Sequence, residues 1–266
     1  MVKIALLHKQ TPTLISGNYL LRLAKRLFGS KMRNGKKDVE EIIGQLSKSI
    51  SQNSPDILIG PEYLFCNPNR LYTPKEKTEL IRCLEEITEN SSTLLVPGTI
   101  VWRNGSIYAN TAPVIYHGKT IREIEKLSAR GIDVGFCGNG VQCIDHSELK
   151  SRYAAGHIFQ EYIKNHMVTV DGKNYLIEIC DDHSYIAENQ SLSIPKTVDY
   201  QIIVSCEHYD HFETDPGRLF LREGGLLIEC NGEKPTSFVA ALKKKELQPL
   251  HTSESPAAEG IEYISK

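Results

Sequence analysis

The sequence of 266 residues lacks the features that mark several large classes of protein. Its formal net charge is only −2, so nothing indicates a surface that binds nucleic acid or another polyanion. No stretch approaches the roughly 20 apolar residues that cross a bilayer. A complete phosphate-binding loop, G-x-x-x-x-G-K-[ST] or G-x-G-x-x-G, is also missing. We therefore expect no nucleic-acid partner and no membrane partner.

Cysteine usage argues against a disulfide-stapled protein. The seven cysteines are an odd number at irregular spacings, which does not fit a disulfide framework. The amino terminus, Met-Val-Lys-Ile-Ala-Leu-Leu-His, is too short in its apolar part for a secretory signal and is typical of a first core strand. We therefore expect the protein in the reducing cytoplasm.

The composition is that of an ordinary globular domain, with 40% hydrophobic and 24% charged residues. The length allows one large α/β domain or two small ones. No repeat and no linker is visible, so we expect a single domain over residues 1–266. Ser253, Ser255, Pro256 and Gly260 indicate a loosely held tail from about residue 250.

Apolar periodicity predicts strands that alternate with helices. Buried strands are predicted over residues 2–8, 56–60, 93–97, 201–205, 226–229 and 237–240. Helices are predicted over 39–50 and 73–90, and hairpins over 106–125 and 167–180, with turns at His117-Gly118 and Asp171-Gly172. Residues 127–157 lack a clear period, and we expect them to form a long ordered loop along one wall of a site.

Three reactive side chains follow predicted strands. Glu62 comes after the strand at 56–60, Lys126 ends the first hairpin, and Cys180 ends the second. An open α/β sheet gathers its chemistry at the carboxyl ends of its strands. A carboxylate base, a fixed cation and a thiol are the parts that a thiol hydrolase needs to attack a carbon–nitrogen bond.

A free cysteine is most often a small buried core residue, so Cys180 alone would carry little. The chain, however, changes at once from an apolar strand to the polar turn Asp181-Asp182-His183. This change places the sulfur at the mouth of the strand, where a tight turn directs backbone N–H groups toward whatever the sulfur binds. Cys180 is therefore the candidate nucleophile. Asp181 is a candidate supporting residue, and Asp182 and His183 are candidate substrate contacts.

Glu62 and Lys126 could equally be solvated surface residues, the commonest fate of both types. Glu62 is followed by Tyr63, Leu64 and Phe65, and apolar neighbours of this kind raise the pKa of a carboxyl, which suits a base that works near neutrality. An ammonium at Lys126 would favour a thiolate beside it and could hold a developing oxyanion. Tyr63 is a further candidate substrate contact.

These segments resemble the nitrilase superfamily, the carbon–nitrogen hydrolases with a Glu–Lys–Cys triad. The ordered triad with its flanking residues is the most specific part of the resemblance. The matching stretches are residues 3–6, 55–65, 96–99, 108–114, 118–126 and 168–182, with weaker matches over 200–205 and 225–231.

The resemblance implies a four-layer α-β-β-α sandwich and acyl-thioester chemistry. By this resemblance Cys180 is the nucleophile, Glu62 is the general base, and Lys126 with the backbone N–H after Cys180 binds the oxyanion. A second glutamate of the family is matched best in position by Glu148. The expected substrate is a small amide, N-carbamoyl compound or nitrile, with an amide favoured over a nitrile. No metal and no organic cofactor is required.

The chain departs from the family after the nucleophile. Family members commonly have an aromatic residue, an aspartate, a basic or polar residue and then Phe-Pro-Glu, whereas here only Asp182 fits. The helix after the next strand is reduced to something like residues 218–223, and the carboxyl end is short. The resemblance allows a homodimer, although the elements that form the usual dimer surface are reduced.

Several other functions stay open on the sequence alone. The run Cys206-Glu207-His208-Tyr209-Asp210-His211 contains metal-ligand types, but its spacing fits no familiar zinc pattern and is more typical of a pocket wall, with His208 as a substrate contact. A Cys–His enzyme could use His183 or His208 as the base for Cys180. The same triad could transfer an acyl group to an amine or alcohol, and a nitrilase-like scaffold could bind without catalysis.

Overall fold

The computed structural model describes residues 2–9, 35–67, 70–127, 157–183, 196–206, 219–232, 237–252 and 260–266. The strands are β1 (Lys3–His8), β2 (Ile57–Ile59), β3 (Leu94–Val96), β4 (Ile100–Asn104), β5 (Ile107–Tyr116), β6 (Lys119–Glu125), β7 (Met167–Val170), β8 (Lys173–Ile179), β9 (Val198–Ser205), β10 (Leu221–Asn231), β11 (Ser237–Lys243), β12 (Glu246–Thr252) and β13 (Gly260–Ser265). The helices are α2 (Gly35–Asn53), α3 (Pro74–Thr88) and α5 (His157–His166).

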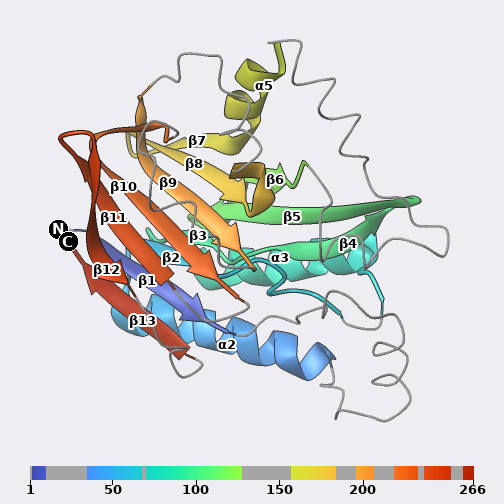
Figure 1. The fold of residues 1–266 in the computed structure, drawn as a ribbon. Coiled ribbons are helices and arrows are strands. Elements are labelled where there is room, and N and C mark those ends of the chain that lie inside the picture. Colours follow the sequence, from blue (N-terminus) through green and yellow to red (C-terminus); the bar gives the residue numbers. More distant parts are fainter. Residues whose placement is uncertain are drawn as a thin grey trace, which may run out of the picture.

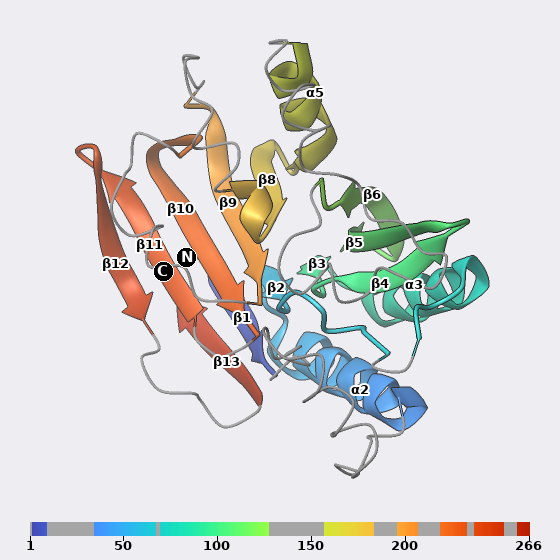
Figure 2. The same ribbon diagram turned by 45° about the vertical axis from the view of Figure 1, so that its right-hand side comes forward.

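Two β-sheets stack face to face and carry helices on their outer faces (Figure 1). Within the described residues, the first sheet has the order β13-β1-β2-β3-β5-β4, with β6 also paired to β5. The second sheet has the order β12-β11-β10-β9-β8-β7. α2 and α3 cover the first sheet and α5 lies against the second, as the turned view also shows (Figure 2). The predicted four-layer α-β-β-α sandwich is confirmed.

The segment Ile57-Leu58-Ile59 shows how one strand serves two cores. Side chains alternate across a strand, so neighbours in the sequence point to opposite faces. Ile57 and Ile59 belong to the cluster between the two sheets, which also contains Ile177 of β8. Leu58 belongs to the cluster under α2 and α3. Because β2 lies between parallel neighbours and is covered on both faces, its sequence is apolar throughout.

The helix α3 begins where its sequence predicts. Thr73 is the N-cap residue, and its hydroxyl accepts a hydrogen bond from the Glu76 N–H at 3.3 Å while the Glu76 carboxylate accepts one from the Thr73 N–H at 2.9 Å. Pro74 occupies the first helical position, where no N–H is needed. In the described part of the chain no helix has the length and apolar character to span a membrane.

Both predicted hairpins are present, as β5–β6 and β7–β8. Their turns have two successive residues with positive φ, 49° and 68° at His117 and Gly118 and 50° and 73° at Asp171 and Gly172. Turns of this kind match the twist of the strands that they join. Each hairpin returns the chain along its second strand, β6 or β8, which ends directly before Lys126 or Cys180.

The carboxyl end differs from the loose tail that we expected. β12 closes the edge of the second sheet, and β13 pairs antiparallel with the whole of β1. β1 is buried over most of its length, and a buried backbone needs hydrogen-bond partners, which β13 supplies. β13 is a short, half-exposed edge strand in which only Ile264 is buried, so its sequence lacks the apolar run of a core strand. The sequence did not predict β4 or α5 either.

The loops after β2 and β3 cross in close contact, and glycine makes this possible. Gly98 has a φ of +90°, and a Cβ built on it would lie 2.1 Å from the carbonyl oxygen of Pro61. A Cβ on Gly60 would lie 2.6 Å from the carbonyl oxygen of Pro97. The crossing fixes the backbone that leads directly into Glu62.

We expect Gly98→Ala to destabilise the protein by about 3 kcal/mol or more, because backbone strain and a steric overlap with Pro61 add. Urea unfolding followed by circular dichroism measures the change. Gly44→Ala is the matched control: Gly44 lies in α2 with nothing within 4 Å of an added Cβ, so this change should be neutral or slightly stabilising. Equal stability of the two variants would contradict the close crossing.

Candidate active site

Glu62 lies three residues beyond β2 and is fully buried. Its Oε1 accepts a hydrogen bond from Lys126 Nζ at 2.8 Å and a second from Asn110 Nδ2 at 2.9 Å. The Glu62 backbone N–H donates to the carbonyl oxygen of Ser205 at the end of β9, at 3.2 Å. Breaking a buried pair of this kind by removing one partner typically costs about 3–5 kcal/mol. Removal of either Glu62 or Lys126 would therefore leave an uncompensated charge buried in the site.

Lys126 follows β6 directly. Its backbone N–H donates to the carbonyl oxygen of Asn110 at 2.8 Å, which extends the β5–β6 pairing by one residue. The side chain is only 3% exposed, and its ammonium lies 5.8 Å from the centre of the Tyr63 ring. A buried cation needs an anion and an electron-rich neighbour, and Glu62 and Tyr63 supply these. Tyr63 itself is buried and has a positive φ of 59°.

Cys180 follows β8 directly and turns the chain sharply. Its φ is +49°, a left-handed conformation that costs a residue with a Cβ on the order of 1 kcal/mol. The Cys180 N–H donates to the carbonyl oxygen of Val204 at 2.9 Å, and its own carbonyl oxygen accepts from the His183 N–H at 3.1 Å. The strand thus ends in a single tight turn at the thiol, as the sequence predicted.

The thiol lies in a polar but closed environment. The Ser205 hydroxyl donates toward Cys180 Sγ at 3.9 Å. Burial raises the pKa of the Cys180 thiol well above its usual value, and the Glu62 carboxylate raises it further, while the Lys126 ammonium and the Cys206 backbone N–H act in the opposite direction. The charges of Glu62 and Lys126 therefore both act on the sulfur. At neutral pH the sulfur carries its proton.

The residues after Cys180 are anchored to protein groups. The two Asp182 carboxylate oxygens lie 3.2 and 3.1 Å from the backbone N–H of Leu127, which ties the Cys180 turn to the segment that carries Lys126. Asp181 is buried on the turn, and its charge adds to the groups that raise the thiol pKa. His183 points back to Glu178, with 2.8 Å between Nδ1 and Oε2.

Two candidate residues, Glu148 and His208, lie outside the described residues, as does the rest of the run 207–211. Of that run only the preceding Cys206 is described, and it is buried beside Tyr63 and Tyr108. Among the residues that the structure describes, no group of three or more histidine, cysteine, aspartate or glutamate side chains could hold a metal ion.

Sequence reasoning missed several residues that shape the site. Asn110 holds Glu62, Thr99 accepts from the Tyr63 N–H at 2.8 Å, and Ser205 contacts the sulfur. Asn110 and Thr99 stand out as polar side chains within apolar, buried runs. A buried polar side chain needs a partner, and that signal could have found both. Ser205 ends a predicted strand and carried no comparable signal.

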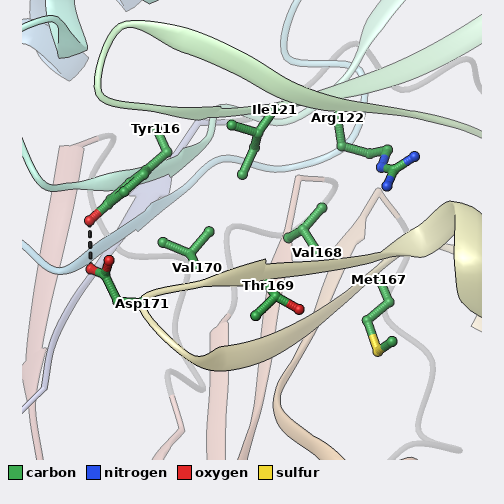
Figure 3. Close-up of a pocket in the computed structure, with 8 residues that line it drawn as sticks. All are labelled: Tyr116, Ile121, Arg122, Met167, Val168, Thr169, Val170 and Asp171. Atoms are coloured by element: carbon green, nitrogen blue, oxygen red, sulfur yellow. Dashed lines mark hydrogen bonds between the residues drawn. The ribbon is translucent and has the colours of Figure 1, made fainter.

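A cavity of about 400 Å³ lies elsewhere, between the β5–β6 hairpin and β7 (Figure 3). It is lined by Tyr116, Ile121, Arg122 and residues 167–171. Figure 3 also shows the Tyr116 hydroxyl donating to Asp171, a bond of 2.6 Å. None of Glu62, Lys126 and Cys180 lines this cavity. The candidate site is the buried charge pair rather than this cavity, because the thiol of Cys180 and the charges that act on it meet there.

No protein-family model and no curated protein matches the sequence. Solved structures do match. Nit3 of Saccharomyces cerevisiae, a member of branch 10 of the nitrilase superfamily, is 13% identical with a TM-score of 0.62 and covers 99% of this chain and 89% of its own. An amidase from Nesterenkonia sp. is 13% identical with a TM-score of 0.59, again over 99% of this chain and 89% of that chain.

A longer protein also matches. The glutamine-dependent NAD+ synthetase of Acinetobacter baumannii is 16% identical with a TM-score of 0.60, and the match covers 98% of this chain but 45% of the synthetase. At such low identities the similarity concerns the fold. The chain has the fold of the nitrilase superfamily.

Proposed function

We propose that the protein hydrolyses a carbon–nitrogen bond in a small amide through a thioester on Cys180. The observation that carries this proposal is the buried Lys126–Glu62 pair, 2.8 Å between Nζ and Oε1, whose charges act on a buried thiol at the end of β8. The fold supports it, since the neighbours include amidases, and a glutamate-to-glutamine mutant of a Nesterenkonia amidase has acrylamide added to its active-site cysteine.

The raised pKa of the Cys180 thiol supports the role of general base for Glu62. Because burial and the Glu62 carboxylate raise the pKa of Cys180, a free thiolate is scarce at neutral pH. The sulfur must lose its proton as it attacks, and the neighbouring carboxylate is the acceptor. Glu62 then returns that proton to the departing amine. The C–N bond breaks as the thioester forms.

The negative charge that develops on the substrate oxygen must be stabilised by hydrogen-bond donors. We assign this role to the Lys126 ammonium and to the backbone N–H of Asp181, the residue after Cys180, and one such donor is worth about 3–4 kcal/mol in other enzymes. A carbonyl oxygen makes full use of them, which favours an amide or N-carbamoyl substrate over a nitrile. Water activated by Glu62 then cleaves the thioester and releases the carboxylic acid. This sequence of steps requires no cofactor.

The test uses acrylamide and a panel of short amides, N-carbamoyl compounds and nitriles. We expect acrylamide to add to Cys180 much faster than to Cys83, a partly exposed cysteine of α3, as measured by peptide mass spectrometry. We expect at least one amide of the panel to release ammonia and to leave an acyl adduct on Cys180 in quenched samples. Labelling of Cys180 no faster than Cys83 would refute the proposal.

A further inference from the structure

A second buried polar cluster lies on the other side of β8 from the thiol. Side chains alternate along the strand: Ile177 and Ile179 face the cluster between the sheets, whereas Leu176 belongs to the outer cluster with Tyr162 of α5. Glu178 shares the outer face with Leu176, and its Oε1 accepts from the Tyr162 hydroxyl at 3.1 Å. Glu178 is fully buried and stands two residues before Cys180.

The Glu178 carboxylate is held by three donors. His183 Nδ1 and Gln201 Nε2 lie 2.8 and 2.6 Å from Oε2, and the Tyr162 hydroxyl binds Oε1. The Gln201 amide is oriented unambiguously, because its Oε1 accepts from the Phe220 N–H at 3.0 Å. Its Nε2 therefore faces the carboxylate as a donor. Because an ionised carboxylate only accepts hydrogen bonds, we infer that His183 Nδ1 carries a proton in its contact with Glu178.

Burial by itself raises the pKa of Glu178, but the interaction with His183 and the hydrogen bonds from His183, Gln201 and Tyr162 outweigh burial and hold that pKa below its usual value. The carboxyl thus stays ionised in the interior. A buried carboxylate with a full set of donors is a rigid anchor, because losing any partner would leave a buried charge unsatisfied.

His183 connects this anchor to the nucleophile. The chain leaves β8 at Cys180 with a left-handed φ, makes one turn closed by the His183 N–H on the Cys180 carbonyl oxygen, and returns its imidazole to Glu178. Glu178 and His183 thus bracket the thiol on both sides in the sequence. Asp182, between them, binds the Leu127 N–H. The strained turn is held from two directions.

We propose that Glu178 and His183 form a positioning pair that fixes the Cys180 turn, so that the sulfur stays between the sheets beside Glu62 and Lys126. This inference rests on the proposed function, because it assigns what keeps that nucleophile in place. His183 acts here from the side of β8 that faces α5, as a clamp on the turn. This role differs from that of a base for the thiol or of a contact for the substrate.

The test measures acrylamide addition to Cys180, with Cys83 of the same molecule as the internal reference. We expect His183→Ala to slow addition at Cys180 by about 10²-fold, since small displacements of a reacting group cost that much. His183→Asn places an amide N–H where Nδ1 stood, and it should recover most of the rate. A merely space-filling histidine would not be rescued by the smaller, polar asparagine.

A double-variant cycle tests the pair. Glu178→Gln keeps the shape but loses the charge, and it should slow addition by about tenfold. In a His183→Ala background the same change should have almost no further effect, because the contact is already gone. Rate losses that simply multiply would show that the two residues act independently and would overturn the pairing.

His166→Ala is the matched control. His166, the last residue of α5, is also a buried histidine, but its hydrogen bond and its ring contact are both with Tyr162, with ring centres 3.8 Å apart. We expect this variant to lose stability, yet to label at Cys180 within about threefold of the wild-type rate at a temperature well below melting. An equal loss of labelling rate at Cys180 in His166→Ala and His183→Ala would show that the effect comes from general destabilisation, and it would overturn the proposal.

These experiments distinguish failure of the positioning pair from failure of the proposed hydrolase. If wild-type Cys180 reacts selectively but His183→Ala reacts equally fast, the positioning pair is refuted and the proposed hydrolase stands. If wild-type Cys180 reacts no faster than Cys83, the proposed function falls and the positioning role falls with it.

Discussion

Cys180→Ala should reduce amide hydrolysis by at least about 10⁴-fold, since removing the nucleophile of a covalent mechanism leaves only binding and oxyanion stabilisation. The measurement is steady-state release of ammonia from the amide that the wild type turns over fastest. The fold should survive, because the thiol is small and its turn is held by the bonds of Asp182 and His183 rather than by the sulfur.

Cys83→Ala is the matched control for this prediction. Cys83 is partly exposed on α3, and its replacement should leave turnover unchanged. Full activity in Cys180→Ala would remove the thioester mechanism. It would exclude a silent scaffold as well, and the metal-dependent alternative would be the next one to test.

Glu62→Gln should lower kcat by about 10²–10⁴-fold with little change in KM, because both acylation and thioester hydrolysis need the base. The amide oxygen can still accept from Lys126 Nζ and Asn110 Nδ2, so we expect the variant to fold. The ammonium would remain beside the thiol without its carboxylate partner.

In Glu62→Gln we also expect the thiol of Cys180 to lose its proton more easily, although hydrolysis is slower. The Glu62 carboxylate is one of the groups that raise the pKa of Cys180, and Lys126 lowers it. Removing the negative charge must therefore lower the pKa of the thiol, so the pH profile of acrylamide addition should move to lower pH. Slow hydrolysis together with easier thiolate formation would show that the variant has lost its base. Slow hydrolysis without that shift would indicate that the whole site is disrupted.

Glu123→Gln provides the control for Glu62→Gln. Glu123 lies in β6 and pairs with Lys77 at the surface, where an ion pair contributes at most about 1 kcal/mol. We expect neither kcat nor the thiol pH profile to change. An upward or absent shift of that profile in Glu62→Gln would contradict the electrostatic coupling of Glu62 to the sulfur.

The sequence predicted best where a local pattern is enforced by geometry. The turn at Asp171-Gly172 needs two positive φ values, and the apolar run Ile57-Leu58-Ile59 needs cover on both faces, so each predicts its own element. The sequence did not predict β13, because this strand is stabilised by its pairing with the buried strand β1, about 250 residues away in the chain. No local signal reports such a pairing.

The site divides in the same way. Cys180 at the change from apolar strand to polar turn was visible in the sequence, and so was Glu62 ahead of its apolar neighbours. That His183 binds Glu178, or that Asp182 binds the Leu127 N–H, was not visible. From the sequence, His183 and Asp182 are polar residues near a nucleophile, and only their partners show that they hold the turn.

The sequence alone determined which side chains are available: a thiol, a carboxylate and an ammonium, each placed after a strand whose apolar period fixes its depth. The tertiary structure decided which of them meet, and in which state. Glu62 and Lys126 are 64 positions apart, yet they lie 2.8 Å from each other in a buried site. Burial and the field of neighbouring charges depend on residues that the chain brings together only by folding, and these set the protonation of the sulfur.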